Sequence, residues 1–354
     1  MTPSPPTNLV TLDFANMASL VARLGWPSYR TRQILQWIYQ HRIRDIAGMS
    51  NLSRKDRETL GHEAVVERLA SSTLLQSVDG TRKFLFPLKD GLAVESVLIP
   101  DGERLTQCVS TQVGCTLDCG FCVTGQMGLK RNLKAHEIVD QILTVQDRLH
   151  RITSLVFMGM GEPLANFDEL SEALTRLTDT DWGVGFPKRR ITISTAGFSQ
   201  RLHDVARLGV NLAVSLNAST AEQRDRLMPM MNRLHPLPDL LAACRAYPIP
   251  ANRHLTFEYV LLSGENDSAE DAVRLSRLLR GIRCKINLIP FNEFPNSPFR
   301  RPADPVIATF QSILRQKGYD VFIRQNRGRD VWGACGQLGT LPARTAPAPL
   351  STGT

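Results

Sequence analysis

The hydrophobic positions in the first part of the chain follow the spacing of a helix. In the stretch YRTRQILQWIYQHRIRDI, which begins at residue 29, Ile34, Leu35 and Ile38 fall on one side of a helix. Residues 17–70 are therefore predicted to be helical. We expect a small helical accessory domain over residues 1–70.

The pattern changes after residue 70 to short strand-like runs separated by turns. Each turn contains an Asp-Gly pair, a combination that favours tight β-hairpins. The pairs recur at an even spacing, at residues 79–80, 90–91 and 101–102. Residues 71–105 are therefore predicted to form a short antiparallel β extension, and Glu95 lies in one of its strands, AVESVLIP.

From residue 106 onward, strand-like and helix-like segments alternate. Helical spacing is clear in AHEIVDQILTVQDRL, residues 135–149, where the hydrophobic side chains share one face. The strand-like runs are CVSTQV, SLVFMG, RITIST, LAVSLN, TFEYVLL, KINLIPF and DVFIRQ. Repeated strand–helix units predict a parallel sheet, but there are too few for a complete barrel. We expect an α/β fold with a partial (β/α)6 barrel of the TIM type over residues 106–340.

Composition and charge narrow the class of protein. A chain of 354 residues is long enough for one large domain and a smaller one. The sequence shows neither an export signal nor a hydrophobic run of membrane-spanning length, so a cytoplasmic protein is expected. The net charge of +8 favours a polyanionic partner. Residues 341–354 are low in complexity and are predicted to be a disordered tail.

Basic and aromatic residues are mixed in the helical N-terminal region. Arg and Lys outnumber acidic residues between Arg23 and Arg57, and Trp37 and Tyr39 lie among them. Two interpretations stay open. The region is either the solvated face of a small helical domain or an RNA-docking surface, on which arginines reach phosphates and aromatic rings stack on bases.

The cysteines suggest a metal centre. There are seven, an odd number, and a disulfide framework is not expected in the reducing cytosol. Cys115, Cys119 and Cys122 form the tight motif C-x3-C-x2-C in GCTLDCGFCVTG. A structural zinc site or a closed iron–sulfur site needs four ligands. The motif therefore indicates either a metal centre with one open position or a zinc knuckle that lacks a ligand.

Polar residues follow several of the hydrophobic strands. Reactive groups in parallel-sheet enzymes collect at the C-terminal ends of strands, so these residues together predict a cofactor cleft, although each alone could be a helix cap. Glu162 can accept a hydrogen bond from an amine, and Gly161 lets the backbone approach a ligand closely. The other strand-end residues are Ser194, Ser215, Asn217 and Asn292.

Several segments carry a resemblance to known enzymes. The cysteine motif resembles that of the radical S-adenosylmethionine (SAM) enzymes, in which SAM completes the coordination of a 4Fe-4S cluster. ESVLIP, CVSTQVGCTLDCGFC, MGMGEPLAN, KRRITISTAG, NLIPFNEFP and ACGQL resemble, in order and spacing, the RlmN family of dual-specificity RNA methyltransferases. The matching segments run from about residue 28 to residue 340. The related Cfr family shares the cluster motif, but Pro163 and the strand INLIPFN are more similar to RlmN.

The resemblance implies which residues bind the cofactors. Cys115, Cys119 and Cys122 would hold one 4Fe-4S cluster. The residues that would contact SAM are Gly161, Glu162, Ser194, Ser215, Leu216, Asn217 and Asn292. Asn217 stands where the family commonly has His, which changes the contact expected with the ribose of SAM.

The resemblance also implies a mechanism that uses two SAM molecules per turnover. One SAM methylates Cys335, and the second is reduced to a deoxyadenosyl radical that takes a hydrogen atom from this methyl group. The carbon radical adds to carbon 2 of an adenine, which leaves the RNA attached to Cys335. Glu95 then accepts a proton, and Cys108 attacks the sulfur of Cys335 to form a transient disulfide. From sequence alone, Cys108 would instead be a buried strand cysteine and Glu95 a solvent-facing strand residue.

The implied substrates are an adenosine in the peptidyl-transferase region of 23S rRNA and the adenosine beside the anticodon of certain tRNAs. The implied partners are flavodoxin or ferredoxin as electron donor and a disulfide reductant, and a monomer without membrane contact is expected. The implied enzyme class is EC 2.1.1. Three alternatives stay open: methylation at carbon 8 as in the Cfr family, a radical SAM enzyme acting on protein or a small metabolite, and a non-catalytic metal-containing RNA-binding protein.

Overall fold

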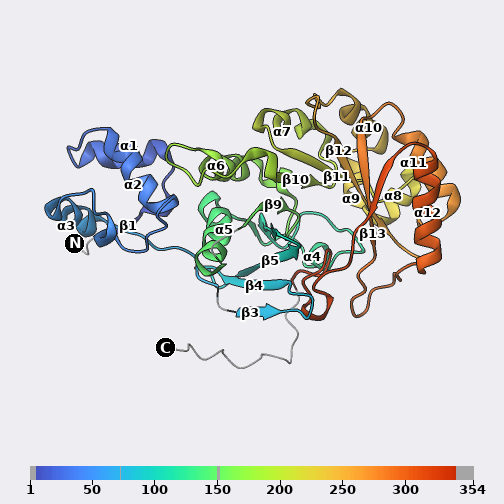
Figure 1. Cartoon of the computed structure of the whole chain (residues 1–354), viewed down its shortest axis with the longest axis horizontal. Helices are drawn as coiled ribbons and strands as arrows, with labels where there is room; N and C mark the ends of the chain where they lie inside the picture. The colour runs from blue at the N-terminus through green and yellow to red at the C-terminus, as the bar shows by residue number, and fades with distance from the viewer. Residues whose placement is uncertain (1–4, 72, 150–151, 340–354) are drawn as a thin grey trace.

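In residues 5–71, 73–149 and 152–339, which the computed structural model describes, the protein is organised around one ten-stranded mixed sheet (Figure 1). The strands lie in the order β14-β13-β12-β11-β10-β9-β6-β5-β4-β3. β14 and β3 are the two edges, so the sheet is open. This agrees with the α/β fold and partial barrel predicted from the sequence.

The strands from β14 to β6 in this order run parallel to their neighbours. Their bounds are β6 Arg104–Cys108, β9 Ser154–Phe157, β10 Ile191–Thr195, β11 Asn211–Ser215, β12 Leu255–Leu261, β13 Cys284–Pro290 and β14 Asp320–Ile323. The connecting helices are α5 Ala135–Leu149, α6 Phe167–Thr178, α7 Leu202–Leu208, α8 Ala221–Leu227, α9 Pro229–Leu234, α10 Leu237–Ala246, α11 Ala269–Leu278 and α12 Asp304–Gln316. Figure 1 shows α7, α10, α11 and α12 on the outer side of the strands. The alternation of strand and helix is the one predicted.

The antiparallel extension belongs to the same sheet. β3 Thr73–Gln76, β4 Arg82–Pro87 and β5 Ala93–Asp101 pair in succession. β5 pairs with β6, which is also parallel to β9. Because β6 takes part in both regions, the extension has a fixed position relative to the barrel.

The predicted strand CVSTQV, residues 108–113, is interrupted in the structure, because β6 ends at Cys108. The chain then turns away from the large sheet. Its next strand, β7 Gln112–Val113, pairs with β8 Arg131–Asn132, and the short helix α4 Val123–Gln126 lies between them. This departure from the sheet creates the loop that carries the cysteine motif.

The N-terminal helices lie at one end of the molecule (Figure 1). They are α1 Phe14–Arg23, α2 Tyr29–Tyr39 and α3 Arg54–Glu63, and strands β1 Thr7–Asn8 and β2 Ala64–Val65 pair beside them. The carboxylate of Asp13 caps α1 by accepting from the Asn16 N–H at 2.7 Å. The hydroxyl of Ser53 caps α3 in the same way. The predicted helical N-terminal region is therefore present.

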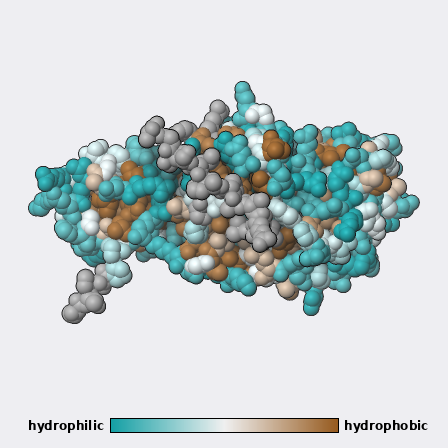
Figure 2. Space-filling view, turned by 90° about the horizontal axis from the view of Figure 1, so that it is seen from below, coloured by the Kyte–Doolittle hydropathy of each residue, from teal (hydrophilic) through white to brown (hydrophobic). Residues whose placement is uncertain are grey.

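The interior contains two hydrophobic clusters. The larger extends through the N-terminal helices, the sheet and the outer helices. The smaller surrounds the cysteine motif and includes Leu117, Phe121, Met228, Met231 and Phe291. The face shown in Figure 2 is mainly hydrophilic, with hydrophobic residues in separate areas. Within the described part of the chain, no helix has the length and apolar character needed to cross a membrane. The predicted tail, residues 341–354, lies outside the described residues.

Candidate active site

The three cysteines of the C-x3-C-x2-C motif lie between β7 and α4, within the smaller hydrophobic cluster. The N–H of Cys122 donates to the carbonyl of Cys119 at 3.1 Å, which closes a tight turn. Burial raises the pKa of all three thiols, and Cys122 and Cys115 raise that of Cys119 further. Thiolates are the form that binds metal, so a metal that binds here displaces these protons.

The donor set fits an iron–sulfur cluster better than a single metal ion. Among residues 5–71, 73–149 and 152–339, no group of three or more His, Cys, Asp or Glu side chains has the geometry to hold one ion. A structural zinc site takes four protein ligands, and the motif supplies three. A four-iron cluster takes one thiolate on each of its irons, and three thiolates leave one iron open.

Glu162 connects two strand ends near this loop. Its Oε1 accepts from the Leu164 N–H at 3.0 Å, and its Oε2 accepts from the Ala196 N–H at 2.7 Å. Burial raises the pKa of Glu162 to about 7, although these N–H groups favour the carboxylate. An ammonium group placed beside Glu162 would stabilise the ionised form, so the position suits the amine of an amino-acid ligand.

Gly161 makes a close backbone approach, with φ +97°. A Cβ at this position would lie 2.5 Å from the Cβ of Gln112. The Gln112 side chain in turn accepts from the Glu162 N–H at 2.9 Å. Packing against Gln112 therefore explains the glycine, and its contact with a cofactor stays a prediction.

Ser194 and Ser215 lie on neighbouring strands, with their hydroxyl oxygens 3.5 Å apart. Asn292 follows β13 and donates through Nδ2 to the carbonyl of Cys335 at 3.1 Å. The Oδ1 of Asn292 is buried and has no hydrogen-bond partner among the residues described. Such an acceptor costs free energy unless a ligand donates to it. This unpaired atom fits a bound cofactor beside Cys335.

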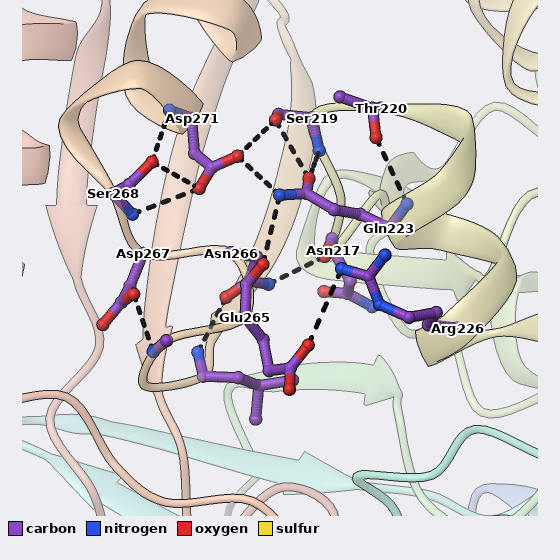
Figure 3. A network of polar contacts seen from close by, with 12 residues as sticks. Asn217, Ser219, Thr220, Gln223, Arg226, Glu265, Asn266, Asp267, Ser268 and Asp271 are labelled. Atoms are coloured by element: carbon purple, nitrogen blue, oxygen red, sulfur yellow. Dashed lines mark hydrogen bonds and ion pairs between the residues drawn. The ribbon is translucent and has the colours of Figure 1, made fainter.

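Asn217 is held in a polar network at the ends of β11 and β12 (Figure 3). Its Oδ1 accepts from the Val260 N–H at 2.9 Å, and its carbonyl accepts from Nδ2 of Asn266 at 2.8 Å. Asn217 is 2% exposed and has φ +57°, and the preceding Leu216 is fully buried. The Asn217 amide therefore helps to fix these strand ends, and its contact with the SAM ribose stays a prediction.

The Cys335 loop, residues 324–339, is fixed at its start by the antiparallel extension. The Gly328 N–H donates to the carboxylate of Asp79 at 2.8 Å, and the carboxylate of Asp330 accepts from the Ser77 hydroxyl at 2.6 Å. Figure 1 shows this loop, in red, beside α4 and the ends of β3 and β4. The turn between β3 and β4 therefore determines where the Cys335 loop begins.

The end of the Cys335 loop is fixed by the cysteine motif. The Val123 N–H donates to the carbonyl of Gly336 at 2.8 Å, and the Thr124 hydroxyl donates to the carbonyl of Leu338 at 2.7 Å. Both donors immediately follow Cys122. These bonds bring Cys335 beside the cluster motif, more than two hundred residues away in sequence.

Glu95 is 2% exposed, so the expectation of a solvent-facing residue was wrong. Nζ of Lys83 lies 2.8 Å from Oε1 of Glu95, and Oε2 accepts from the Gly339 N–H at 2.8 Å. Nζ of Lys83 also donates to the carbonyl of Trp332 at 3.1 Å. Burial raises the pKa of Glu95, while Lys83 lowers it. The pair joins the antiparallel extension to the Cys335 loop.

Cys335 lies close enough to Cys108 to influence the charge of the Cys108 thiol. Burial, and then Cys335, raise the pKa of Cys108 to about 12, whereas Arg324 lowers it. Cys335 also raises the pKa of Cys122. Cys335 itself is exposed and shares a shallow pocket with Arg324, Asn292 and Ile99. The two thiols predicted to form a disulfide therefore lie in the same region as the cluster motif, and the disulfide itself stays a prediction.

Comparisons with known proteins agree with this geometry. Residues 109–276 match the Radical SAM superfamily, and residues 7–66 match the ribosomal RNA large subunit methyltransferase N-terminal domain. The dual-specificity RNA methyltransferase RlmN of Syntrophus aciditrophicus (strain SB) is 46% identical over 335 residues, covering 94% of this chain and 96% of the relative. The enzyme of the same name from Geobacter sulfurreducens is 50% identical over 321 residues, covering 90% and 88%. The chain belongs to the RlmN family.

A solved structure supports membership of the RlmN family. A radical SAM methyltransferase from Sphaerobacter thermophilus has a TM-score of 0.88 and 41% identity, and the match covers 94% of this chain and 99% of that one. The resemblance and the fold predicted from the sequence are thus confirmed. The family is RlmN and not Cfr, and it implies a 4Fe-4S cluster and SAM as cofactors.

Several arginines of the RlmN-type N-terminal domain face carboxylates of the protein itself. Arg42 and Arg44 lie 2.9 and 3.2 Å from Asp147 on α5, and Arg32 lies 2.8 Å from Asp181. These ion pairs hold the domain against α5 and the segment after α6. These arginine charges are therefore partly neutralised by carboxylates of the same chain. An RNA-docking surface on this domain stays a prediction.

Sequence reasoning about the RlmN motifs missed the residues that support Glu95 and Cys335. Lys83 is the clearest, because a lysine in the hydrophobic strand RKFLFP signals a buried partner of opposite charge. Asp79 and Asp330 gave no such signal. They are ordinary turn residues in sequence, and only the fold brings them to the Cys335 loop.

Proposed function

We propose that this protein methylates carbon 2 of an adenosine in RNA and that Cys335 carries the methyl group. The proposed substrates are an adenosine in the peptidyl-transferase region of 23S rRNA and the adenosine beside the anticodon of certain tRNAs. The relatives' name, dual-specificity RNA methyltransferase, supports RNA substrates. One observation carries the proposal: Cys335 is exposed, and hydrogen bonds from Asn292 and Val123 hold its loop beside the cysteine motif. A thiol in that position can meet cofactor, RNA and a second thiol.

The bound cofactors would supply a methyl group from one SAM and a carbon-centred radical from a second SAM. Cys335 accepts the methyl group, because a thiolate is a good acceptor in such a displacement. Asn292 holds the Cys335 carbonyl at 3.1 Å, and Val123 holds that of Gly336 at 2.8 Å. These bonds keep the sulfur in place while its methyl group reacts with the RNA.

Release of the RNA uses Glu95 and Cys108. The adduct radical must also give up its unpaired electron, which the oxidised cluster would accept when bound. Glu95 accepts the proton lost from carbon 2 of the adenine. Cys108 forms a bond to the sulfur of Cys335 as the bond between that sulfur and the methylene carbon breaks. The electron pair of the broken bond stays on the carbon, which takes a proton and becomes the methyl group of the product. A thiol reductant then restores both cysteines.

The pKa of Cys108 keeps this attack from happening early. Burial and the neighbouring Cys335 raise it to about 12, so the thiol is protonated at neutral pH. Arg324 lowers the pKa of Cys108 and so favours the thiolate that this attack needs.

The proposed partners follow from the same chemistry. The cluster needs a one-electron donor, flavodoxin or ferredoxin, and the Cys108–Cys335 disulfide needs a two-electron reductant. Both belong to the cytoplasm, where the protein would act as a monomer. The net charge of +8 supports a polyanionic substrate. Bases in unpaired RNA can be turned out of the stack, which would bring the target adenine to the exposed Cys335.

The Cys108→Ala variant tests the proposal. With SAM, an electron donor and RNA, it should attack the RNA and then stop, because no second thiol frees the adduct. The expected product is a slow band on a denaturing gel that nuclease removes, and peptide mapping should locate the RNA on Cys335. Cys244→Ala is the matched control, since Cys244 is fully buried on α10. Normal turnover by Cys108→Ala, or a methyl group found at carbon 8 by nucleoside mass spectrometry, would overturn the proposal.

A further inference from the structure

Arg224 on α8 is a fully buried cation, with 0% of its surface exposed. Its Nη1 donates to the carbonyl of Leu216 at 3.1 Å, and its Nη2 donates to that of Ala196 at 2.7 Å. The Nε is buried without a hydrogen-bond partner among the described residues. The guanidinium therefore uses only part of its donor capacity on neutral carbonyls.

No carboxylate balances this charge within the part of the chain that the structure describes. The titratable groups that act on Arg224, or on which it acts, are the thiols of Cys119 and Cys244 and the imidazole of His235. Burial lowers the pKa of Arg224 to about 10, which shows how unfavourable its charge is here. A buried charge without a counter-charge is strongly destabilising. Something else must offset that cost.

The place of Arg224 points to the cysteine motif. α8 packs on the motif loop, where the Gly120 N–H donates to the carbonyl of Leu227 at 3.2 Å. Leu227 belongs to the smaller hydrophobic cluster that surrounds Cys115, Cys119 and Cys122. Gly197, next to Ala196, makes room for the cation, because a Cβ there would lie 2.7 Å from Nη2 of Arg224. Charges attract strongly in such a dry environment.

We infer that the Arg224 guanidinium is the counter-charge of the thiolate-bound iron–sulfur cluster and raises its reduction potential. An oxidised four-iron cluster with three thiolates is an anion, and reduction adds one more negative charge. A buried cation whose charge acts on Cys119 favours that electron, since net charge near a cluster is a main determinant of its potential. Arg224 is thus a positioning residue for electron transfer. The inference rests on the family's cluster and not on the proposed role of Cys335.

The experiment is an EPR-monitored redox titration of the anaerobically reconstituted full chain, without SAM or RNA. Arg224→Gln and Arg224→Met remove the charge, and Gln keeps one amide donor for a carbonyl. Arg224→Lys keeps the charge and loses the guanidinium fork. The matched control is Arg226→Gln, because Arg226 lies on the same helix but is 58% exposed and pairs with Glu265 at 3.7 Å (Figure 3).

We expect both neutral variants to shift the reduction equilibrium at least tenfold toward the oxidised cluster, which is about 59 mV for one electron. Arg224→Lys and Arg226→Gln should stay near the wild-type potential. The inference would also be supported if Arg224→Lys holds the cluster and the two neutral variants fold but do not. Iron content measures the cluster, and circular dichroism shows whether each variant is folded. The inference is overturned if the neutral variants keep the wild-type potential, if Arg226→Gln shifts it equally, or if Arg224→Lys also fails to hold iron. Since no RNA is present, a failure here leaves the proposed methylation untouched.

Discussion

The loop of Cys115, Cys119 and Cys122 and the loop of Cys335 are built in different ways. The first is compact, because its three thiols lie within eight residues and are surrounded by one small hydrophobic cluster. The second depends on partners from distant parts of the chain, which include Ser77, Asp79, Asn292 and Val123. The proposed metal-binding part of the site is therefore encoded locally, whereas the proposed methyl-carrying part depends on the whole fold.

The largest expected effect separates the two loops by function. Cys122→Ala should lose the cluster and all RNA methylation, because one iron loses its ligand. Cys335→Ala should keep the iron content and visible absorption of the wild type and still give no methylated RNA. Iron per chain and transfer of a labelled methyl group from SAM measure the two outcomes. Methylation by Cys335→Ala, or iron loss in both variants, would contradict the division of roles.

The second prediction concerns the ion pair that joins the two regions. Lys83→Met leaves Glu95 buried without its cation, so the free energy of unfolding should fall by about 3–5 kcal/mol. The double variant Lys83→Met/Glu95→Gln should recover much of this loss. Lys89→Met is the control, because Lys89 pairs with Glu67 on the surface, where a pair contributes about 0–1 kcal/mol. Urea unfolding at pH 7 measures all three, and equal losses for Lys83→Met and Lys89→Met would show that burial of the pair is unimportant.

A smaller effect should follow from Gly328→Ala, which changes only the start of the Cys335 loop. Gly328 has φ +66°, and a Cβ there would lie 2.7 Å from Cγ2 of Thr81. Gly91→Ala is the control, since Gly91 has φ +81° and nothing within 4 Å of a Cβ. In both variants the free energy of unfolding should fall by about 1–2 kcal/mol, because an alanine is disfavoured in the left-handed backbone conformation. Only Gly328→Ala should also speed alkylation of Cys335, measured by mass spectrometry. Equal rates for the two variants would argue against anchoring of the Cys335 loop at Gly328.

The smallest prediction is a pH effect where the N-terminal domain contacts α5. Burial raises the pKa of Asp140 from 3.8 to about 6, although Arg68 lies 3.5 Å away. The folded chain therefore holds a proton that the unfolded chain releases. The stability that this gives is complete below pH 3.8 and is lost as the pH rises through about 6. Between about pH 5 and about pH 7, the free energy of unfolding of the wild type should fall by about 1 kcal/mol relative to that of Asp140→Asn. Urea unfolding of the two proteins at each pH measures this difference. A constant difference between the two proteins would exclude titration of Asp140 in this range.

The predictable parts of the molecule are those whose signal is local. Helical spacing located the helix at 135–149, and hydrophobic runs located β9 to β14, because burial acts on each segment separately. The strand at Cys108 was predicted to be too long, since the bend that follows depends on pairing between β7 and β8. The burial of Glu95 was missed for the same reason, as its partner Lys83 lies on another strand and Gly339 near the end of the chain.

The residues that hold Glu95 and Cys335 in place also determine the order in which the parts of the site can form during synthesis. A ribosome makes residues 328–339 after every other part of the site. Until they emerge, Lys83 lacks the Trp332 carbonyl and Glu95 lacks the Gly339 N–H, although the cysteine motif has long been complete. A chain truncated before Gly328 therefore keeps the three motif cysteines but lacks the supports of Glu95 and the thiol proposed to carry the methyl group. Cleavage within this loop is expected to abolish RNA methylation while the cysteine motif stays in the chain.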